Sequence, residues 1–389
     1  MSDTIYLDHC ATTPVRPDAL EAMLPYFSQH YGNPSSLHRL GRETGKALRI
    51  ARGQIADVLG CSPGEVIITS SGTEADNLAL RGVAFARRRR GEGNHLVVSA
   101  VEHKGILDTA KQLRDAFDFE MTVLDVDAYG RVSPMDLALA IRPDTLIVSI
   151  MAANNEVGTI QPLAELSAVC RERAVPFHSD AVQATGSLSL NVDELGVDLM
   201  SLGAHKFYGP KGIGLLYLRR GVALQPQITG GSHEGKRRAS TENVAYIVAM
   251  AVALELAQAE RASEAARLAA LRDRLIAGVL AGVPDSYLTG HPTERMANHA
   301  SFVVRGIEAE GMLIGLDMAG ICASSGSACT SGAQEPSHVL TAMGVSRREA
   351  VGHLRLSLGH SNSDAHVDRL LDVLPPLVAR LREMSPFTV

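Results

Sequence analysis

The stretch TLIVSIMAANNEVGTIQPLAELSAVCRERAVPFHSD, residues 145–180, decides the fold. It holds an apolar run at 145–151, a helix-like segment, and a β-rich run that closes on Asp180. Similar runs recur on both sides of it, at residues 66–70, 96–100, 121–126, 198–202 and 213–218. Strands that alternate with helices at this spacing predict an α/β domain around a largely parallel sheet. Several runs are apolar without alternation, which is typical of strands buried on both faces.

The C-terminal part of the chain predicts a second, smaller α+β domain. No Gly or Pro occurs from Thr241 to Ala277, and the composition favours one long helix that bridges the two domains. Two further strand-like runs, 301–307 and 353–359, flank a Gly/Ser/Cys-rich segment at 320–332. A length of 389 residues agrees with two domains, at about 150 residues per domain.

Composition excludes several classes of protein. Lys and Arg number 37 against 43 Asp and Glu, and the one basic run is Arg87 to Arg90, so we expect no nucleic-acid partner. The chain shows neither a secretory leader nor about 20 consecutive apolar residues, which predicts a cytoplasmic protein without a membrane partner. Five scattered cysteines without a CxxC pair predict no disulfide framework and no zinc cluster, and suggest that at least one thiol is kept for its reactivity.

Polar residues follow the predicted strands where a ligand site of an open α/β sheet is expected. Ser71-Gly72-Thr73-Glu74 follows the first run and leads into a helical pattern. Its N–H groups, the Thr73 hydroxyl and the helix dipole would cradle a phosphate. The alternative is an ordinary helix N-cap with Glu in the first turn, and the motif alone does not decide between them.

The other strand ends carry acid–base groups. Glu102-His103 and Asn154-Asn155-Glu156 follow two runs, Gln183 comes shortly after Asp180, and Gly203-Ala204-His205-Lys206 follows 198–202. A lysine, a carboxylate and a phosphate cradle at one sheet edge are what pyridoxal phosphate requires. Neither G-x-x-x-x-G-K-[ST] nor an early G-x-G-x-x-G occurs, which disfavours nucleotide cofactors.

With these motifs the chain resembles the group I cysteine desulfurases, pyridoxal-phosphate enzymes of the class V aminotransferase superfamily. The similarity runs nearly end to end and includes Tyr6-Leu-Asp8, Ala11-Thr-Thr-Pro14, Gly32-Asn-Pro-Ser-Ser36, Arg238 to Asn243, Ser324-Ser-Gly-Ser-Ala-Cys329-Thr-Ser-Gly332 and Arg355. It implies an aspartate-aminotransferase-like fold, with a mostly parallel sheet in a large domain at 16–260. The small domain would comprise 1–15 and 261–389 and carry a mobile Cys loop at about 320–334.

The resemblance also implies a role for each matching residue of the cofactor site. Lys206 would be the Schiff-base lysine, and Asp180 would partner the pyridine nitrogen. Gln183 would contact the ring oxygen, and His103 would stack on the ring and move protons. The remaining cofactor-binding residues would be Gly72, Thr73, Asn155, Gly203, His205 and Thr241. Thr241 would come from the other subunit of a homodimer.

For the substrate, the resemblance implies that Asn155 and Arg355 take the carboxylate of L-cysteine. Cys329 would attack the substrate sulfur and become a persulfide, and the rest of the substrate would become L-alanine. Cys329 would also be a transient ligand of an iron–sulfur cluster. Its thiol, with an ordinary pKa of about 8.5, needs a neighbouring base, for which His103 is the nearest candidate by motif. A sulfur-acceptor protein, such as an iron–sulfur scaffold, would be the partner.

Two positions depart from the family pattern. Gly203 stands where related enzymes usually carry a serine that binds phosphate, with Ser201 as a possible replacement. Cys10 stands before Ala11-Thr-Thr, either lining the entrance or, as we favour, as a small buried hydrophobe. Two other functions stay open: a selenocysteine lyase or other class V lyase or aminotransferase, and a non-catalytic sulfur-relay or scaffold protein.

Overall fold

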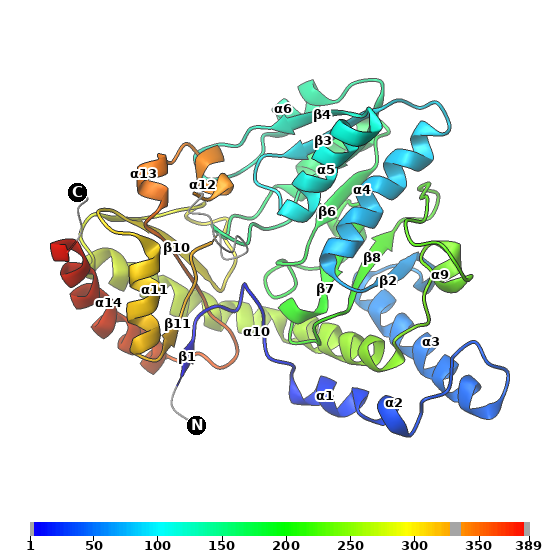
Figure 1. The fold of residues 1–389 in the computed structure, drawn as a ribbon, viewed down its shortest axis with the longest axis horizontal. Coiled ribbons are helices and arrows are strands. Elements are labelled where there is room, and N and C mark those ends of the chain that lie inside the picture. The colour runs from blue at the N-terminus through cyan, green and yellow to red at the C-terminus, as the bar shows by residue number, and fades with distance from the viewer. Residues whose placement is uncertain (1–3, 327–335, 385–389) are drawn as a thin grey trace.

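The computed structural model describes residues 4–326 and 336–384. Its largest sheet has seven strands in the order β2-β8-β7-β6-β5-β3-β4 (Figure 1). β8 is antiparallel to both of its neighbours and the other pairings are parallel, which confirms the predicted α/β fold. The strands are β2 (Val66–Thr69), β3 (His95–Ser99), β4 (Glu120–Leu124), β5 (Thr145–Ser149), β6 (Phe177–Asp180), β7 (Leu199–Gly203) and β8 (Gly214–Leu218).

Helices lie on both faces of this sheet, because most of its strands are apolar on both sides (Figure 1). The helices and 3₁₀ turns of this part are α1 (Pro17–Met23), α2 (Pro25–Ser28), α3 (Arg39–Leu59), η1 (Pro63–Glu65), α4 (Gly72–Arg88), α5 (Lys104–Phe117), α6 (Pro134–Ala140), α7 (Leu163–Glu172), α8 (Val192–Leu195), η2 (Ala204–Lys206) and α9 (His233–Lys236).

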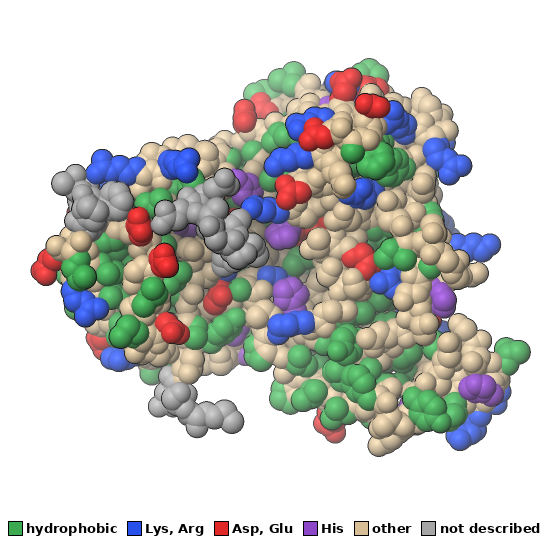
Figure 2. All heavy atoms as spheres, viewed as in Figure 1, with side chains coloured by type: hydrophobic (Ala, Val, Ile, Leu, Met, Phe, Trp, Pro, Cys, Tyr) green, Lys and Arg blue, Asp and Glu red, His purple; other side chains and the backbone are tan. Residues whose placement is uncertain are grey.

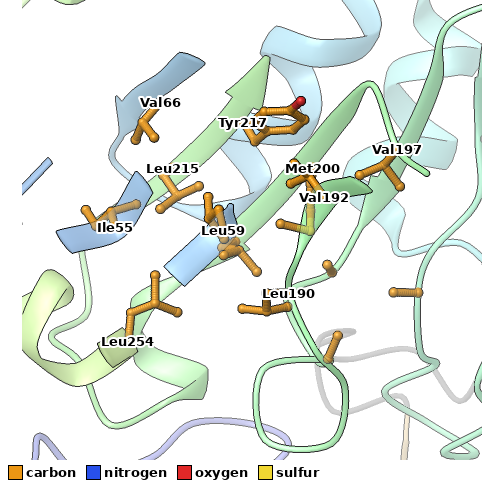
Figure 3. Close-up of a cluster of buried hydrophobic side chains, with 14 of the residues drawn as sticks. Ile55, Leu59, Val66, Leu190, Val192, Val197, Met200, Leu215, Tyr217 and Leu254 are labelled. Carbon is orange, nitrogen blue, oxygen red and sulfur yellow. The ribbon is translucent and has the colours of Figure 1, made fainter. Parts of the chain in front are cut away.

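Alternate residues of the strands feed two apolar clusters, one on each face. On one face Ile55 and Leu59 of α3 pack with Met200 and Tyr217 of the sheet (Figure 3). On the other face α4 and α5 cover strand residues such as Leu216. The sheet is thus fixed from both sides, and its carboxyl edge forms a rigid platform for the residues that follow each strand.

The ends of these helices follow from local sequence. α3 stops at Gly60, which adopts φ 68°, a left-handed conformation that glycine accepts without strain. α4 begins after Ser71, whose hydroxyl accepts a hydrogen bond from the Glu74 N–H at 3.1 Å. The N-cap alternative for this motif is therefore correct, and it is compatible with a phosphate site because other first-turn N–H groups stay available.

The second part of the molecule contains a three-stranded antiparallel sheet and a small parallel pair. The sheet has the order β12-β10-β9, and β1 pairs with β11. The bounds are β1 (Ile5–Tyr6), β9 (Ser286–Leu288), β10 (His299–Val304), α11 (Ala309–Met318), β11 (Ile321–Cys322), α12 (His338–Ala342), α13 (Arg347–Ala350), β12 (His353–Ser357) and α14 (Asp364–Met384).

The predicted long helix is α10 (Val244–Gly282), with 39 residues and a length of about 58 Å. It starts three residues later than expected and continues past Gly278. Its first half packs in the cluster of the large sheet, and its second half packs with Ile5, Leu7 and the second part (Figure 1). Division of the chain after residues 15 and 260 stays a prediction. Within the two described ranges, none of the helices combines the length and apolar character needed to cross a bilayer.

Candidate active site

Three neighbouring strands deliver the central residues of the site. β5, β6 and β7 lie side by side, Asp180 closes β6, and Lys206 ends the 3₁₀ turn that follows β7. His103 is the N-cap residue of α5, just after β3. Parallel strands end at one edge, so residues separated by about one hundred positions meet there. Figure 2 shows His, Lys and Arg side chains gathered in the hollow between the two parts of the molecule.

Asp180 is held rigidly at this edge. Its side chain is buried, and Oδ1 accepts a hydrogen bond from the Val182 N–H at 2.9 Å. One polar atom from each of Asp180, Asp76 and His103 lies within 4.8 Å of the others. Burial raises the pKa of Asp180, while His103 and Lys206 act in the opposite direction.

His103 has a defined tautomer. Its Nδ1 accepts a hydrogen bond from the Gly105 N–H at 3.0 Å, so the neutral ring carries its proton on Nε2. The geometry therefore leaves Nε2 as the nitrogen that can exchange a proton with a ligand.

Lys206 faces the N-terminal segment. Nζ donates hydrogen bonds to the carbonyl oxygens of Cys10 and of Ala11, the latter at 2.8 Å. Gln183 Nε2 donates to the same Cys10 carbonyl at 2.9 Å. Cys10 itself is buried against Ala153 and Met296, which confirms that it is a small buried hydrophobe. The structure thus joins Lys206 and Gln183, two predicted cofactor residues, through one backbone oxygen.

The predicted phosphate cradle lies where α4 begins beside the end of β7. A Cβ added to Gly72 would lie 3.9 Å from the Gly203 backbone and only 2.6 Å from the Val182 side chain. The two glycines therefore let the backbones approach closely at the start of α4, where the first N–H groups have no carbonyl partner within the helix. Thr73 is exposed at this helix start.

His205 lies beside the cradle, and its Nδ1 is 3.1 Å from Thr12 Oγ1. Burial and the charge of Lys206 lower the pKa of His205 to about 4, so the ring is neutral at pH 7. Ser201 does not replace the missing serine, because it is fully buried and its Oγ lies 2.9 Å from His178 Nε2.

Arg355 points at the N-terminal segment and at the loop after β5. Nη2 pairs with Asp8 at 2.8 Å, and Nη1 donates to the Asn155 carbonyl at 3.0 Å. Its Nε is buried and has no hydrogen-bond partner among the described residues. The predicted pair of Asn155 and Arg355 is therefore brought together, but through the backbone of Asn155.

Two predicted residues are not placed in the site of this single chain. Thr241 is exposed, three residues before α10. Cys329 lies outside the described residues, as does most of the predicted loop at 320–334. The described residues that flank this segment meet at one carboxyl group: Ser337 Oγ donates to Glu156 Oε2 at 2.5 Å, and a Cβ on Gly326 would lie 2.7 Å from the same oxygen.

Sequence reasoning missed Asp76 and the pairing of Asp8 with Arg355. Asp76 has the helical spacing i, i+3, i+4, i+7 with Ala79, Leu80 and Val83, so it stands on the apolar face of its helix. Its place on that face was the available signal, because a buried carboxyl group needs a reason. No comparable signal marked Asp8, whose partner is 347 residues away.

The donor set fits pyridoxal 5'-phosphate. A buried carboxylate suits a protonated pyridine nitrogen, and Lys206 is at the same edge. The open helix N-terminus between Gly72 and Gly203 suits a phosphate. These features together define a site for an enzyme of the pyridoxal-phosphate class.

Comparisons with known proteins agree with this geometry. The model of the class V aminotransferase family matches residues 5–370. A cysteine desulfurase IscS of Methanosarcina thermophila is 49% identical over 384 residues, 99% of this chain and 94% of the relative. One from Dictyoglomus turgidum is 46% identical over 387 residues, 100% and 98% of the two chains.

Solved structures give the same result. A NifS-like protein superposes with a TM-score of 0.90 at 35% identity, covering 97% of this chain and all of that one. A structure of SspA in complex with cysteine superposes with a TM-score of 0.81 at 34% identity, covering 91% and 99%. The chain belongs to the class V aminotransferases and, within them, to the pyridoxal-phosphate-dependent cysteine desulfurases. The predicted family, fold class, cofactor and enzymatic activity are confirmed.

Proposed function

We propose that this chain converts L-cysteine to L-alanine and transfers the sulfur to the thiol of Cys329, which becomes a persulfide. The observation that carries the proposal is the convergence of Asp180, His103 and Lys206 at one edge of the sheet. The bound cofactor supplies an electron sink for negative charge at the substrate Cα. Asp180 would keep the pyridine nitrogen protonated, and Lys206 would hold the cofactor covalently.

The other residues would orient the reactants. The buried guanidinium of Arg355 would bind the substrate carboxylate in place of its present partner Asp8, because planar guanidinium groups pair with carboxylates through two hydrogen bonds. His103 would move a proton at Nε2, the nitrogen that Gly105 leaves free. Gly72, Thr73 and His205 would hold the phosphate.

The described cysteines support Cys329 as the sulfur acceptor. Burial raises the pKa of Cys10 and Cys322, and raises that of Cys61 and Cys170 to about 12. Each of these four thiols is therefore a poor nucleophile near neutral pH. Cys329, in a Gly- and Ser-rich stretch, is the remaining cysteine of the chain.

The test is Cys329→Ser, which keeps the size of the side chain but removes a readily ionised nucleophile. We expect the variant to bind the cofactor and to lose alanine formation from cysteine, measured by amino-acid analysis. Cys322→Ser is the matched control and should keep alanine formation. Parent-level turnover by Cys329→Ser would rule out this acceptor.

A homodimer is the second part of the proposal. Apolar side chains gather over α1 and α2 (Figure 2), where Leu24 and Phe27 are each 55% exposed. Phe27 also contacts Tyr246 at the start of α10, with ring centroids 6.2 Å apart. This apolar surface is therefore close to exposed Thr241, which would reach the phosphate of the partner's site.

The dimer is tested by mixing two inactive parents, Lys206→Ala and Thr241→Ala. If Thr241 acts across the interface, one site of the hybrid holds both defects and the other holds none. Each hybrid dimer should therefore regain about half of the activity of the unmutated dimer. Hybrids no more active than their parents would contradict binding across subunits.

A sulfur-acceptor protein in the cytoplasm is the third part. The names IscS and NifS-like among the relatives suggest a role in iron–sulfur assembly. The acceptor would then be an iron–sulfur scaffold, with Cys329 as a transient cluster ligand. The assay is transfer of labelled sulfur from the persulfide to purified scaffold proteins, with Cys329→Ser as the negative control. Equal labelling by both proteins would refute transfer through Cys329.

A further inference from the structure

A second carboxylic acid lies behind Asp180. Asp76 belongs to α4 and is only 1% exposed, and one of its oxygens is within 4.8 Å of the Asp180 carboxyl. Asp76 Oδ1 has no hydrogen-bond partner among the described residues. An ionised carboxylate in such a place would be costly, because a buried charge needs hydrogen bonds or a counter-ion to replace its hydration.

The groups that face Asp76 come from every element packed against it. His178 of β6 is nearest, with Nε2 3.8 Å from Oδ1. Its Nδ1 lies 2.8 Å from Ser149 Oγ, and burial lowers its pKa to about 3, so it is neutral and offers no charge. Ser201 of β7 has its Oγ 2.9 Å from Nε2 of the same ring and also hydrogen-bonds to Asp76, which lowers the pKa of Asp76 but less than burial raises it.

The remaining neighbours are the loop after β3 and the start of α5. Glu102 is fully buried, and burial raises its pKa to about 8. His103 carries no proton on Nδ1, and a Cβ on Gly105 would lie 3.4 Å from Asp76 Oδ2. The cation of this region, Lys206, acts on Asp180.

Two buried carboxyl groups this close do not both ionise easily, because each negative charge opposes the other. Burial and the charge of Asp180 raise the pKa of Asp76 well above its usual value. Asp180 has the more favourable surroundings for a negative charge, since it accepts the Val182 N–H and is near His103 and Lys206. Asp76 is therefore the more favourable of the two sites for a shared proton.

We propose that Asp76 and Asp180 form a coupled pair with a single negative charge, in which Asp76 is the neutral positioning residue that keeps the charge on Asp180. This inference rests on the proposed role of Asp180 toward the cofactor nitrogen. In this arrangement the charge is at the edge of the sheet, where a ligand meets it, and not beneath α4.

Infrared spectroscopy of the full-length holoenzyme measures the pair directly, through the C=O stretching band of a protonated carboxyl group. At neutral pH this band should be present in the parent and absent in Asp76→Asn. Glu102→Gln is the matched control, because Glu102 is also buried but should leave the Asp76 band in place. The proposal fails if Asp76→Asn has the same C=O bands as the parent, because Asp76 is then already ionised in the parent.

The coupling has its own readout. In Asp180→Asn the midpoint pH of the Asp76 band should fall by about one unit or more, because a nearby negative charge has been removed. In the parent, the dissociation constant of the cofactor should change with pH around this midpoint. In Asp76→Asn this change should be absent. A purely structural role would move neither quantity, and an unchanged midpoint in Asp180→Asn would overturn the proposal.

A measurement on the unmutated protein guards against variants that do not fold. In protein made with ¹³C-carboxyl aspartate, the C=O band of Asp76 should shift and that of Glu102 should not. The absence of any shifted band near neutral pH would show that Asp76 is not protonated. Failure of the proposed function gives a different result. In that case Asp180→Asn binds the cofactor as tightly as the parent, with the same absorption spectrum, whatever the Asp76 band does.

Discussion

Gly203→Ser should tighten cofactor binding. Gly203 has an extended backbone (φ −127°, ψ 120°), which serine adopts without strain. A Cβ at this position has its nearest neighbours at 3.4 Å (Gly72 N) and 3.7 Å, so the side chain fits in ordinary contact. Its hydroxyl would lie near the first N–H groups of α4, which would hold the phosphate.

The magnitude follows from the charge of the acceptor. A hydrogen bond to a charged group contributes about 1.5–3 kcal/mol, and the lower value corresponds to a roughly tenfold smaller dissociation constant. The assay is titration of the cofactor-free protein with pyridoxal phosphate, followed by absorbance. Gly203→Ala is the control, because it adds the same Cβ without the hydroxyl. Equal dissociation constants for the serine and alanine variants would refute the reasoning.

Three further substitutions test the structure. Gly72→Ala should weaken cofactor binding at least tenfold in the same titration, because the new methyl meets Val182 at 2.6 Å; parent affinity would contradict the close approach. In the parent, the pKa of Glu102 is about 8 in the folded state and higher than in the unfolded state, so the free energy of unfolding falls as pH rises. Glu102→Gln removes this loss, and its stability relative to the parent should grow by about 1.4 kcal/mol per pH unit between pH 5 and 7.5. A difference in urea denaturation that does not change with pH would contradict this. Glu234→Ala should cost about 3–5 kcal/mol in urea denaturation by leaving Arg52 unpaired, whereas loss below 1 kcal/mol would show that water replaces the pair.

The positions of polar residues along the chain were enough to predict much of the candidate site. Parallel strands end at one edge of a sheet. The strand-like runs that precede Asp180, Lys206 and His103 therefore predicted that these three residues lie close together. The Ser71 motif is local in the same way, since the cap and the Glu74 N–H that it accepts are only three residues apart. The sequence pattern also sufficed for the long helix, whose start was misplaced by three residues because the N-cap is Asn243.

Contacts between distant segments required the tertiary structure. Asp8 reaches Arg355 because residue 8 lies beside Ser357 of β12, and no periodic pattern links positions 347 residues apart. The sequence made Ser201 a candidate phosphate ligand, but in the structure its hydroxyl hydrogen-bonds to the ring of His178.

The sequence by itself determined which residue types stand at the carboxyl ends of the strands, because strand and helix periodicities are local properties of the chain. Only the tertiary structure decided which of those groups lie close enough to share charge. Asp76 was one of several polar residues in its helix until packing placed it within 4.8 Å of Asp180. Electrostatic coupling depends on separation in space and on burial, and neither is encoded at a fixed spacing along the chain.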